Sequence, residues 1–389
     1  MERNLIDVLF SLLRFELGSG AALTEDEREL ATNEIDALFG LSKAHDMEHL
    51  VADALSRQGL LVGDSEAVKK FGKAQMIALF RYERINYDYR EICRVLEESQ
   101  IEFLPLKGAL IRDFYPAPWM RTSCDIDILV REESLESAIS VLTDKLSFKW
   151  NGEREYHDVS LFSPGGVHLE LHFSILEHTE QLDRVLSQVW EHASALADER
   201  YQMRLTNEFF IFHHIAHMAY HFISGGCGIK PFLDLAVMKD RIELDVAKLR
   251  ALLDQSELWE FYESALALTD VWFFGAQPSD LTERMQEYIL TGGVYGTLEN
   301  RVAVGQGKTG GKLGYVLGRI FVSTDHLITS YPSLKRHRWL MPFYQVRRWF
   351  DIVFGGRLKR SVREIRVSGG ISDDKAELTK ALIDELGLK

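Results

Sequence analysis

The stretch TSCDIDILV, residues 122–130, decides how the middle of this chain folds. Its apolar residues alternate with polar ones, which is the pattern of a β-strand with one face against a core. Asp125 and Asp127 share the other face, about 6.5–7 Å apart at Cα. Two ionised carboxylates this close repel each other, so one must hold a proton unless a cation lies between them. The pair is either a solvated strand face or a site for divalent ions, and its oxygen ligands suit Mg²⁺.

A second stretch carries a third acid with the same alternation. In VHLELHF, residues 167–173, the polar face presents His168, Glu170 and His172. If this strand lies beside the first, Glu170 joins the two aspartates. Two aspartates that bind both metal ions, with a third acid on the ion that activates the attacking hydroxyl, form the two-metal arrangement for phosphoryl or nucleotidyl displacement. Asp127→Asn removes one of the two like charges, so we predict that this substitution stabilises the metal-free protein.

The flanking residues complete a small α/β unit. IEFLPLKG (101–108) predicts a short strand that ends in Lys107-Gly108 before a helix, where backbone N–H groups and a lysine can meet phosphates. Residues 134–146 predict a helix, and 157–173 predict a β-hairpin. The order is therefore strand, helix, strand, helix and hairpin.

The remainder of the chain predicts helices, because its apolar residues recur every three or four positions. We therefore expect an α+β fold. An N-terminal helical domain (1–98) precedes a small mixed-sheet core (99–180), and a C-terminal helical region (181–389) follows. The glycine-rich residues 292–314 lack the spacing of a phosphate-binding P-loop, which needs glycine where Val302 stands. They predict a mobile connection between the middle helices and the basic C-terminal ones.

The composition is that of a folded cytoplasmic protein. Hydrophobic residues make up 46% of the chain, yet no apolar run approaches the ~20 residues that cross a bilayer. The first residues, MERNLIDVLFSLLRF, predict an amphipathic helix and not a signal peptide. Cys93, Cys124 and Cys227 lie far apart, which argues against a disulfide framework or a cysteine zinc site and fits a reducing compartment.

Charge is unevenly distributed. The net charge of −14 argues against general nucleic-acid binding. Residues 334–366 nevertheless hold ten Lys and Arg against Asp351 and Glu364, so this basic segment carries +8 and the remainder −22. The aromatic residues Trp339, Phe343, Trp349, Phe350 and Phe354 are interleaved with it. Two interpretations stay open: terminal helices that pack these aromatics on the acidic body, or a docking surface for an anionic partner such as lipid headgroups or RNA.

Histidines form a second pattern in FHHIAHMAYHF, residues 212–222. His213, His217 and His221 recur at four-residue steps along one face of a predicted helix. Such a face can hold zinc, although the Glu of H-E-x-x-H is missing. It can equally be a buried polar seam between helices.

Residues 103–130 (FLPLKGALIRDFYPAPWMRTSCDIDILV) followed by VHLELHF resemble the uncharacterised nucleotidyltransferase family of bacteria, within the DNA polymerase beta-like nucleotidyltransferase superfamily. That superfamily is marked by a glycine motif at a helix start, a D-h-D/E pair and a third acid on a later strand. Here the resemblance implies that these would be Gly108, Asp125 with Asp127, and Glu170. HMAYHFISGGCGIKPFLDLAVM (217–238) is similar to a motif downstream of the core in many members.

The resemblance implies roles for further residues. Superfamily members usually have Gly-Gly or Gly-Ser where this chain has Gly108-Ala109, so Lys107 or Arg121 would supply part of the charge that holds a triphosphate. Apart from the resemblance, His168 and His172 flank Glu170, so they are either histidines that merely satisfy the strand or donors to that acid or to nucleotide phosphates. The downstream motif implies a site for the acceptor, made of His217, His221, Lys230 and Asp234, in which Asp234 would orient or deprotonate the acceptor.

The sequence therefore predicts a magnesium-dependent nucleotidyltransferase that moves a nucleoside monophosphate from an NTP to an acceptor hydroxyl and releases pyrophosphate. Asp125, Asp127 and Glu170 would bind two Mg²⁺ ions, with Mn²⁺ as an alternative. The acidic body favours a small molecule or a protein over RNA as acceptor. A nucleotide-binding sensor without catalysis and a helical interaction protein are the alternatives.

Overall fold

The computed structural model describes residues 3–177, 179–197, 199–294, 296–324, 327–328, 331–354 and 358–388. The chain divides into two compact units. The first unit comprises Met1–Tyr220 and Ile229–Thr282, and the second comprises His221–Gly228 and Glu283–Lys389. The domain boundaries that the sequence pattern suggests, near residues 98 and 180, stay predictions.

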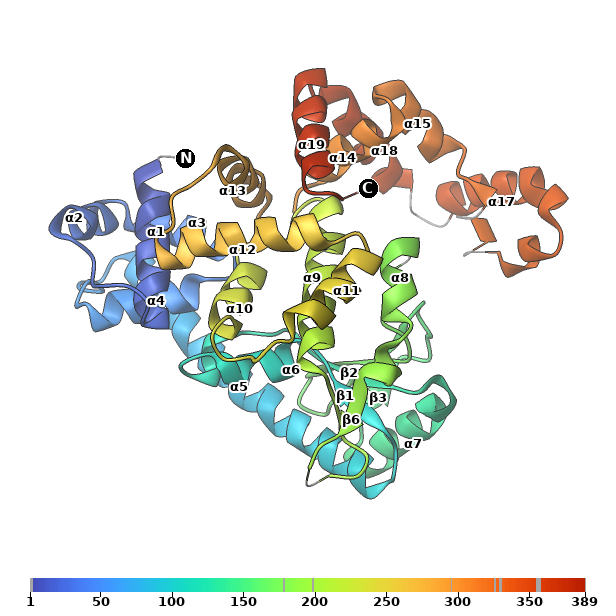
Figure 1. Ribbon diagram of the computed structural model, residues 1–389, viewed down its shortest axis with the longest axis horizontal. Coiled ribbons are helices and arrows are strands. Elements are labelled where there is room, and N and C mark those ends of the chain that lie inside the picture. The colour runs from blue at the N-terminus through green and yellow to red at the C-terminus, as the bar shows by residue number, and fades with distance from the viewer. Residues whose placement is uncertain are drawn as a thin grey trace. The chain divides into compact units, whose positions relative to one another are not determined.

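The first unit contains a five-stranded mixed sheet (Figure 1). In spatial order its strands are β1 (Phe103–Pro105), β2 (Asp125–Val130), β5 (His168–His172), β4 (Asp158–Phe162) and β3 (Lys149–Trp150). Strands β2 and β5 run parallel, and the other neighbours run antiparallel. The predicted α+β fold, a small mixed sheet flanked by helices, is thereby confirmed.

One face of the sheet is apolar and packs against two helices. The isoleucines of β2 and the leucines of β5 are buried in a core that they share with α5 (Glu66–Glu98) and α7 (Leu135–Leu146). The long helix α5 runs alongside the strands in Figure 1. Because side chains alternate along a strand, burial of the apolar set turns Asp125, Asp127 and Glu170 to the opposite face.

Further helices complete the first unit. Helix α2 begins with a capping box in which Thr24 accepts a hydrogen bond from the Glu27 N–H and Glu27 accepts one from the Thr24 N–H. The helices are α1 (Arg3–Leu17), α2 (Glu25–Asn33), α3 (Ile35–Ala44), α4 (Glu48–Arg57), α8 (Glu180–Leu186), α9 (Asn207–Ile223, whose end belongs to the second unit), α10 (Lys230–Met238), α11 (Val246–Gln255) and α12 (Trp259–Phe274).

Shorter elements connect them. Strands β6 (Ala193–Ala195) and β7 (Met203–Leu205) pair as a two-stranded sheet. Short 3₁₀ helices lie at η1 (Arg112–Phe114), η2 (Pro118–Met120), η3 (Glu132–Ser134), η4 (Val189–His192), η5 (Pro332–Lys335) and η6 (Arg338–Leu340).

Helices also dominate the second unit. They are α13 (Asp280–Gly292, which begins in the first unit), α14 (Leu298–Thr309), α15 (Lys312–Ile320), α17 (Met341–Phe354), α18 (Leu358–Gly370) and α19 (Asp373–Glu385). Within the part of the chain that the structure describes, no helix combines the length and apolar character that a bilayer crossing requires.

The prediction that residues 292–314 merely connect helices is wrong for much of this stretch. Thr297 caps helix α14 by accepting a hydrogen bond from the Asn300 N–H, and Val302 lies in a buried cluster. The glycines permit close packing, because a Cβ on Gly305 would lie 2.5 Å from the Tyr315 ring. The glycine content therefore reflects packing between helices here, and not only loops.

Candidate functional site

The parallel pairing of β2 with β5 brings the three predicted acids together. Asp127 lies opposite Glu170 in the register, and Asp125 lies opposite His168. The expectation that VHLELHF lies beside the aspartate strand is confirmed. The sheet thereby builds a carboxylate site on its polar face from two strands that are about forty residues apart in sequence.

Two groups of potential metal ligands share Glu170. Ligand atoms of Asp125, His168 and Glu170 lie within 4.8 Å of one another, and so do those of Asp127, Glu170 and His172. Glu170 therefore belongs to both groups, and each group also contains one aspartate and one histidine. Carboxylate oxygens at this spacing match the donor set that Mg²⁺ and Mn²⁺ prefer.

The two aspartates have opposite electrostatic environments. Asp127 is buried, and its Oδ1 accepts hydrogen bonds from Lys107 Nζ at 3.4 Å and His172 Nε2 at 3.1 Å. Burial alone would raise the pKa of Asp127, but Lys107 and His172 hold that pKa well below its usual range. Burial, followed by repulsion from Asp127 and Glu170, raises the pKa of Asp125 to about 6.

This asymmetry corrects the expectation that Asp127→Asn stabilises the metal-free protein. Asp127 is the acid whose charge Lys107 and His172 neutralise, so its loss removes favourable contacts. The unrelieved repulsion lies at Asp125. A divalent cation beside Asp125 and Glu170 would remove that repulsion, and the residues present therefore fit such an ion.

His172 links the acids within the site. Its side chain is buried, with Nε2 lying 3.1 Å from Asp127 Oδ1 and 3.5 Å from Glu170 Oε2. Burial opposes its protonation, but hydrogen bonds to Asp127 and Glu170 raise the pKa of His172 to about 9. The hydrogen bond with His172 in turn lowers the pKa of Glu170. His172 therefore carries positive charge at neutral pH, next to two of the carboxylates.

Lys107 enters the site from the end of β1. The Leu106 N–H donates to the Asp127 carbonyl at 3.0 Å, which continues the pairing of β1 with β2 and aims the next residue at the site. Lys107 has φ +41°, a strained conformation for a residue with a side chain, and such strain concentrates at functional sites. Burial would lower the pKa of Lys107, but Asp127 and Glu170 raise it, so the lysine stays charged.

Gly108 provides space at the start of the short helix α6 (Gly108–Ile111). A Cβ at this position would lie 2.5 Å from Ser123 Oγ and 2.6 Å from Arg121 Nη1. A larger residue therefore cannot enter without displacing the loop that leads into β2. The motif glycine is required here by the close approach of a neighbouring arginine.

Arg121 is held by an internal ion pair. Its Nε and Nη2 donate to the two carboxylate oxygens of Asp234, each at 2.9 Å, and its Nη1 donates to Ser123 Oγ at 3.3 Å. The Tyr115 hydroxyl donates to Asp234 Oδ1 at 2.7 Å. Asp234 is fully buried in α10, and its contacts with Arg121 and Tyr115 fix the loop before β2. A direct contact of Arg121 with nucleotide stays a prediction.

Lys230 fixes the same loop from the start of α10. Its ammonium group pairs with Asp46 and lies 3.2 Å from Thr122 Oγ1, and Asp46 also accepts a hydrogen bond from Thr122. The attractions of Lys230 and Thr122 outweigh burial and lower the pKa of Asp46. Asp46 could not be predicted from the sequence, because a single acid in a helical pattern carries no signal of a long-range partner.

The histidines of α9 do not form a common cluster with the acids. His217 Nδ1 donates to Glu177 Oε1 at 3.0 Å, and burial raises the pKa of Glu177 to about 7. His213 is buried, and burial followed by the charge of Lys107 lowers its pKa to about 3. His221 belongs to the second unit. Among the described residues, the groups with metal-ligand spacing all lie within 125–172. An acceptor site that includes His217 and His221 stays a prediction.

A third potential ligand group adjoins the site and was missed in the sequence. His157, Asp158 and His172 place ligand atoms within 4.8 Å of one another. The rings of His157 and His172 stack with centroids 5.5 Å apart and planes inclined by 5°. The His-Asp pair at the start of the hairpin is the only local signal for this group. It extends the polar cluster along β4.

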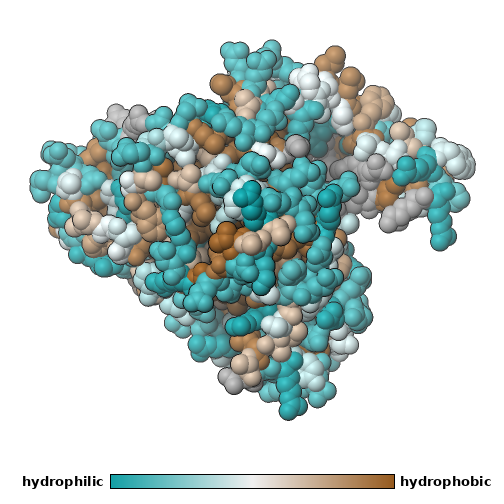
Figure 2. Space-filling view, viewed as in Figure 1, coloured by the Kyte–Doolittle hydropathy of each residue, from teal (hydrophilic) through white to brown (hydrophobic). Residues whose placement is uncertain are grey.

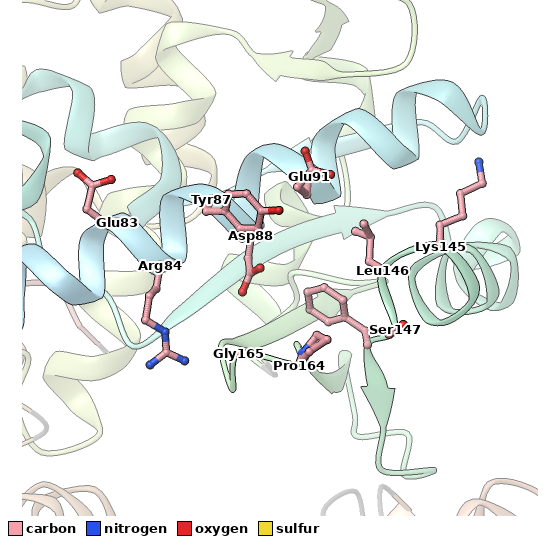
Figure 3. A pocket seen from close by; sticks show the side chains of 11 residues that line it. Glu83, Arg84, Tyr87, Asp88, Glu91, Lys145, Leu146, Ser147, Pro164 and Gly165 are labelled. Atoms are coloured by element: carbon pink, nitrogen blue, oxygen red, sulfur yellow. The ribbon is translucent and has the colours of Figure 1, made fainter.

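A separate cavity lies on the helix-covered side of the sheet (Figure 3). Its volume is about 580 Å³. It is lined by Glu83, Arg84, Tyr87, Asp88 and Glu91 of α5, Lys145 and Leu146 of α7, and Ser147, Phe148, Pro164 and Gly165. Because α5 and α7 cover the apolar face, this cavity is distinct from the carboxylate site on the other face.

Comparison with known proteins points to the part of the chain that contains the carboxylate site. A family described as uncharacterised nucleotidyltransferases matches residues 31–274, more than half of the 389 residues. The match includes every residue of the carboxylate site and ends before α13, the first of the helices that lead into the C-terminal part of the chain. Neither a curated protein nor a solved structure matches the chain significantly. With its three acids on adjacent strands inside the matched region, the chain belongs to the family of uncharacterised nucleotidyltransferases.

Proposed function

We propose that this protein transfers a nucleoside monophosphate from an NTP to an acceptor hydroxyl, and that its core is of the DNA polymerase beta-like kind found in bacterial nucleotidyltransferases. The observation that carries the proposal is the parallel register that sets Asp127 opposite Glu170, with Asp125 one pleat away. Three carboxylates on one sheet face, beside a charged lysine, suit a polyphosphate substrate with divalent ions.

Two Mg²⁺ ions, or Mn²⁺, would be held by Asp125, Asp127 and Glu170. When bound, such ions neutralise the triphosphate and stabilise both the attacking and the leaving oxygen. Lys107 would contact the phosphates, because its ammonium group lies 3.4 Å from Asp127 Oδ1. Gly108 leaves room for Arg121, and His172 holds the orientation of the two acids.

The reaction follows from this arrangement. The acceptor oxygen forms a bond to the α-phosphorus, and the bond from that phosphorus to the α–β bridging oxygen breaks. Pyrophosphate leaves with the electron pair, and the hydroxyl proton passes to Glu170, whose side chain is 30% exposed. Catalysis of this type is mainly positioning and charge neutralisation, so loss of one ligand acid removes most of the rate.

The acceptor would be a small molecule or a protein side chain more readily than RNA. The net charge of −14 repels a polyanionic acceptor from the chain as a whole. Of the residues of the suggested acceptor site, His217 is half-buried and pairs with Glu177, whose carboxyl also feels the charge of Lys107. Lys230 and Asp234 would act indirectly by fixing residues 115–123, the loop before β2.

Thermal unfolding with ligands tests the proposal without knowledge of the acceptor. Wild type and Asp125→Asn are heated with ATP, GTP, CTP or UTP, with Mg²⁺ or with EDTA. A nucleotide at about 100 times its Kd stabilises the folded state by about 2.7 kcal/mol. We expect a Mg²⁺-dependent shift with at least one nucleotide in the wild type and its loss in the variant. Glu136→Gln, on α7 behind the sheet, is the matched control that retains the shift.

The outcomes separate the candidate functions. A shift together with pyrophosphate release, once an acceptor is supplied, supports the transferase. A shift with no turnover for any acceptor class indicates a nucleotide sensor. If no nucleotide changes the unfolding temperature, in Mg²⁺ or in Mn²⁺, nucleotide binding is contradicted. The helical interaction protein is then the remaining candidate.

A further inference from the structure

Helix α17 of the second unit exposes its apolar side. Phe343, Val346, Phe350, Val353 and Phe354 are 63%, 44%, 58%, 49% and 78% exposed. They recur every three or four residues and so lie along one face of the helix, which we call the α17 stripe. An apolar row of this length is unusual at a free surface and marks an interaction site.

The opposite side of α17 is the one that contacts its own unit, and it does so through polar groups. Gln345 is buried, and its Nε2 donates to the Ile320 carbonyl at 3.3 Å. Trp349 Nε1 donates to the same carbonyl at 2.9 Å, and Arg348 Nη2 donates to the Arg319 carbonyl at 3.1 Å. A surface helix normally does the reverse and buries its apolar side. Hydrogen bonds to the end of α15 therefore fix α17 with the stripe outward.

The neighbouring helix α15 repeats the pattern. Leu313, Leu317 and Phe321 are exposed at four-residue steps. The ring of Phe321 meets that of Trp349 edge to face, with centroids 5.5 Å apart, so the two helices are in contact. Brown and tan atoms lie beside teal ones in Figure 2 where Figure 1 places α15 and α17. Exposed apolar side chains therefore occur on α17 and also along α15 and the residue that follows it.

Basic side chains accompany this surface, and the acids of the segment are engaged elsewhere. Asp351 accepts a hydrogen bond from the Tyr331 hydroxyl at 2.6 Å, and Glu364 is buried in an ion pair with Arg319 at 2.9 Å. The arginines at 336, 338, 347, 363 and 366 are exposed. Arg357, which also belongs to the basic segment, lies outside the described residues. The segment thus presents positive charge next to apolar side chains.

We propose that the second unit docks on an anionic membrane surface, with the α17 stripe at the boundary of headgroups and acyl chains and the arginines on lipid phosphates. An exposed apolar face with basic residues beside it is the pattern of helices that lie in the membrane interface. Trp339, 77% exposed just before α17, is the residue type that prefers this depth. This surface lies outside the family match and is independent of the nucleotide site.

The side chains of the stripe favour lipid over single-stranded RNA or a second copy of the chain as the partner. Single-stranded RNA would be held by aromatic rings that stack on bases, but Val346 and Val353 have no ring to offer. A second copy of the same surface would bring like charges together. Of the two interpretations that the sequence left open for residues 334–366, the exposure of Phe343, Phe350 and Phe354 favours docking.

Vesicle flotation with the full-length protein tests the apolar contribution. Vesicles of phosphatidylcholine alone are compared with vesicles that also contain phosphatidylglycerol. We expect binding only with the anionic lipid, and Phe350→Asp should weaken it about tenfold because burial of a phenyl ring is lost and a charge is added. Leu378→Asp is the matched control. Leu378 is exposed on α19 of the same unit but away from the stripe, and its variant should bind like the wild type.

Two further measurements test the contribution of the arginines to membrane binding and the depth at which Trp339 enters the membrane. Arg347→Gln and Arg363→Gln should each weaken binding about fivefold, and added salt should weaken the wild type. The fluorescence of Trp339 should shift to the blue on vesicles, and this change should be missing in Trp339→Phe.

The proposal is overturned if wild type and Phe350→Asp bind anionic vesicles equally, or if neither binds. It is also overturned if an RNA oligonucleotide binds with the same arginine dependence while vesicles do not. A dimer in sedimentation that Phe350→Asp dissociates, without vesicle binding, would assign the stripe to a second copy instead. Because each variant retains the carboxylate site, nucleotide-dependent thermal shifts should be unchanged in all of them, which keeps this test separate from that of the proposed function.

Discussion

Two aspartates of the same strand differ because of what lies within a few ångströms of each. Lys107 and His172 donate hydrogen bonds to Asp127, so its charge is stabilised in the fold. Asp125 instead faces Asp127 and Glu170, and its pKa rises from 3.8 to about 6. At the scale of the residue, identical side chains one pleat apart therefore contribute to stability with opposite sign.

We predict that Asp125→Asn stabilises the metal-free protein in EDTA by about 1–2 kcal/mol at pH 8. Because the folded pKa of Asp125 lies above the unfolded value, the contribution of this carboxyl to stability is lost as pH rises from about 4 to about 6 and stays level above that. The difference between the two proteins should therefore vanish near pH 4. Urea unfolding at pH 4 and pH 8 measures it.

Asp127→Asn is the comparison for this experiment. It should destabilise the protein by about 1–3 kcal/mol at pH 8, because Lys107 and His172 lose a charged acceptor in a buried site. If both variants shift stability in the same direction, the electrostatic asymmetry described here is incorrect.

Gly108 supports a second prediction at this scale. The Cβ of Gly108→Ala would contact Arg121, which cannot move away easily because Asp234 holds it through two hydrogen bonds. We expect a loss of about 1–3 kcal/mol in the free energy of unfolding and a weaker nucleotide-dependent thermal shift. Gly72→Ala in α5, where no described atom lies within 4 Å of the added carbon, should gain about 0.5–1 kcal/mol. Equal effects of the two variants would contradict the steric argument.

At the scale of elements, helix α10 holds the loop that precedes β2. Asp234 and Lys230 both lie on α10, and they reach Arg121 and Thr122 respectively. The loop is therefore attached to a helix more than a hundred residues further along the chain. Asp234 and Lys230 thus fix the loop beside the carboxylate site, and their role in binding an acceptor stays a prediction.

We predict that Asp234→Ala costs about 3–5 kcal/mol of unfolding free energy, because it leaves the buried guanidinium of Arg121 without its carboxylate. The double variant Arg121→Met/Asp234→Leu should recover at least half of that loss, since no buried charge remains. Urea denaturation measures both.

Arg94→Gln is the matched control, because the pairs of Arg94 with Glu91 and Glu98 are exposed and should contribute little to stability. A double variant as unstable as Asp234→Ala would show that the ion pair itself, and not the unpaired charge, determines the cost.

At the scale of the whole molecule, the chain has two compact units with separate cores. Leu142 of α7 lies in the core under the sheet, and Ile383 of α19 is buried in the second unit. We predict two transitions in scanning calorimetry. Leu142→Ala should lower one and Ile383→Ala the other, each by roughly 5–10 °C. A single transition that both variants lower would mean that the units unfold together.

Much of the fold and the main acids could be predicted from the sequence because their signals are local. Alternation in 122–130 and 167–173 shows two strands, and the same alternation shows which face each acid takes. Periodicity likewise predicted the helices that flank the sheet. The pattern failed at 292–314, where glycines serve close packing of α14 and not a loop, because composition does not show what approaches a residue.

The sequence by itself determined that three acids lie on polar strand faces, since side-chain direction along a strand depends only on alternation. Only the tertiary structure decided which acid carries stabilised charge, because Lys107 and His172 reach Asp127 through strand pairing. It also decided that Asp234 holds Arg121 and that α17 exposes its apolar side. Such contacts join residues far apart in the chain, and no local pattern encodes their partners.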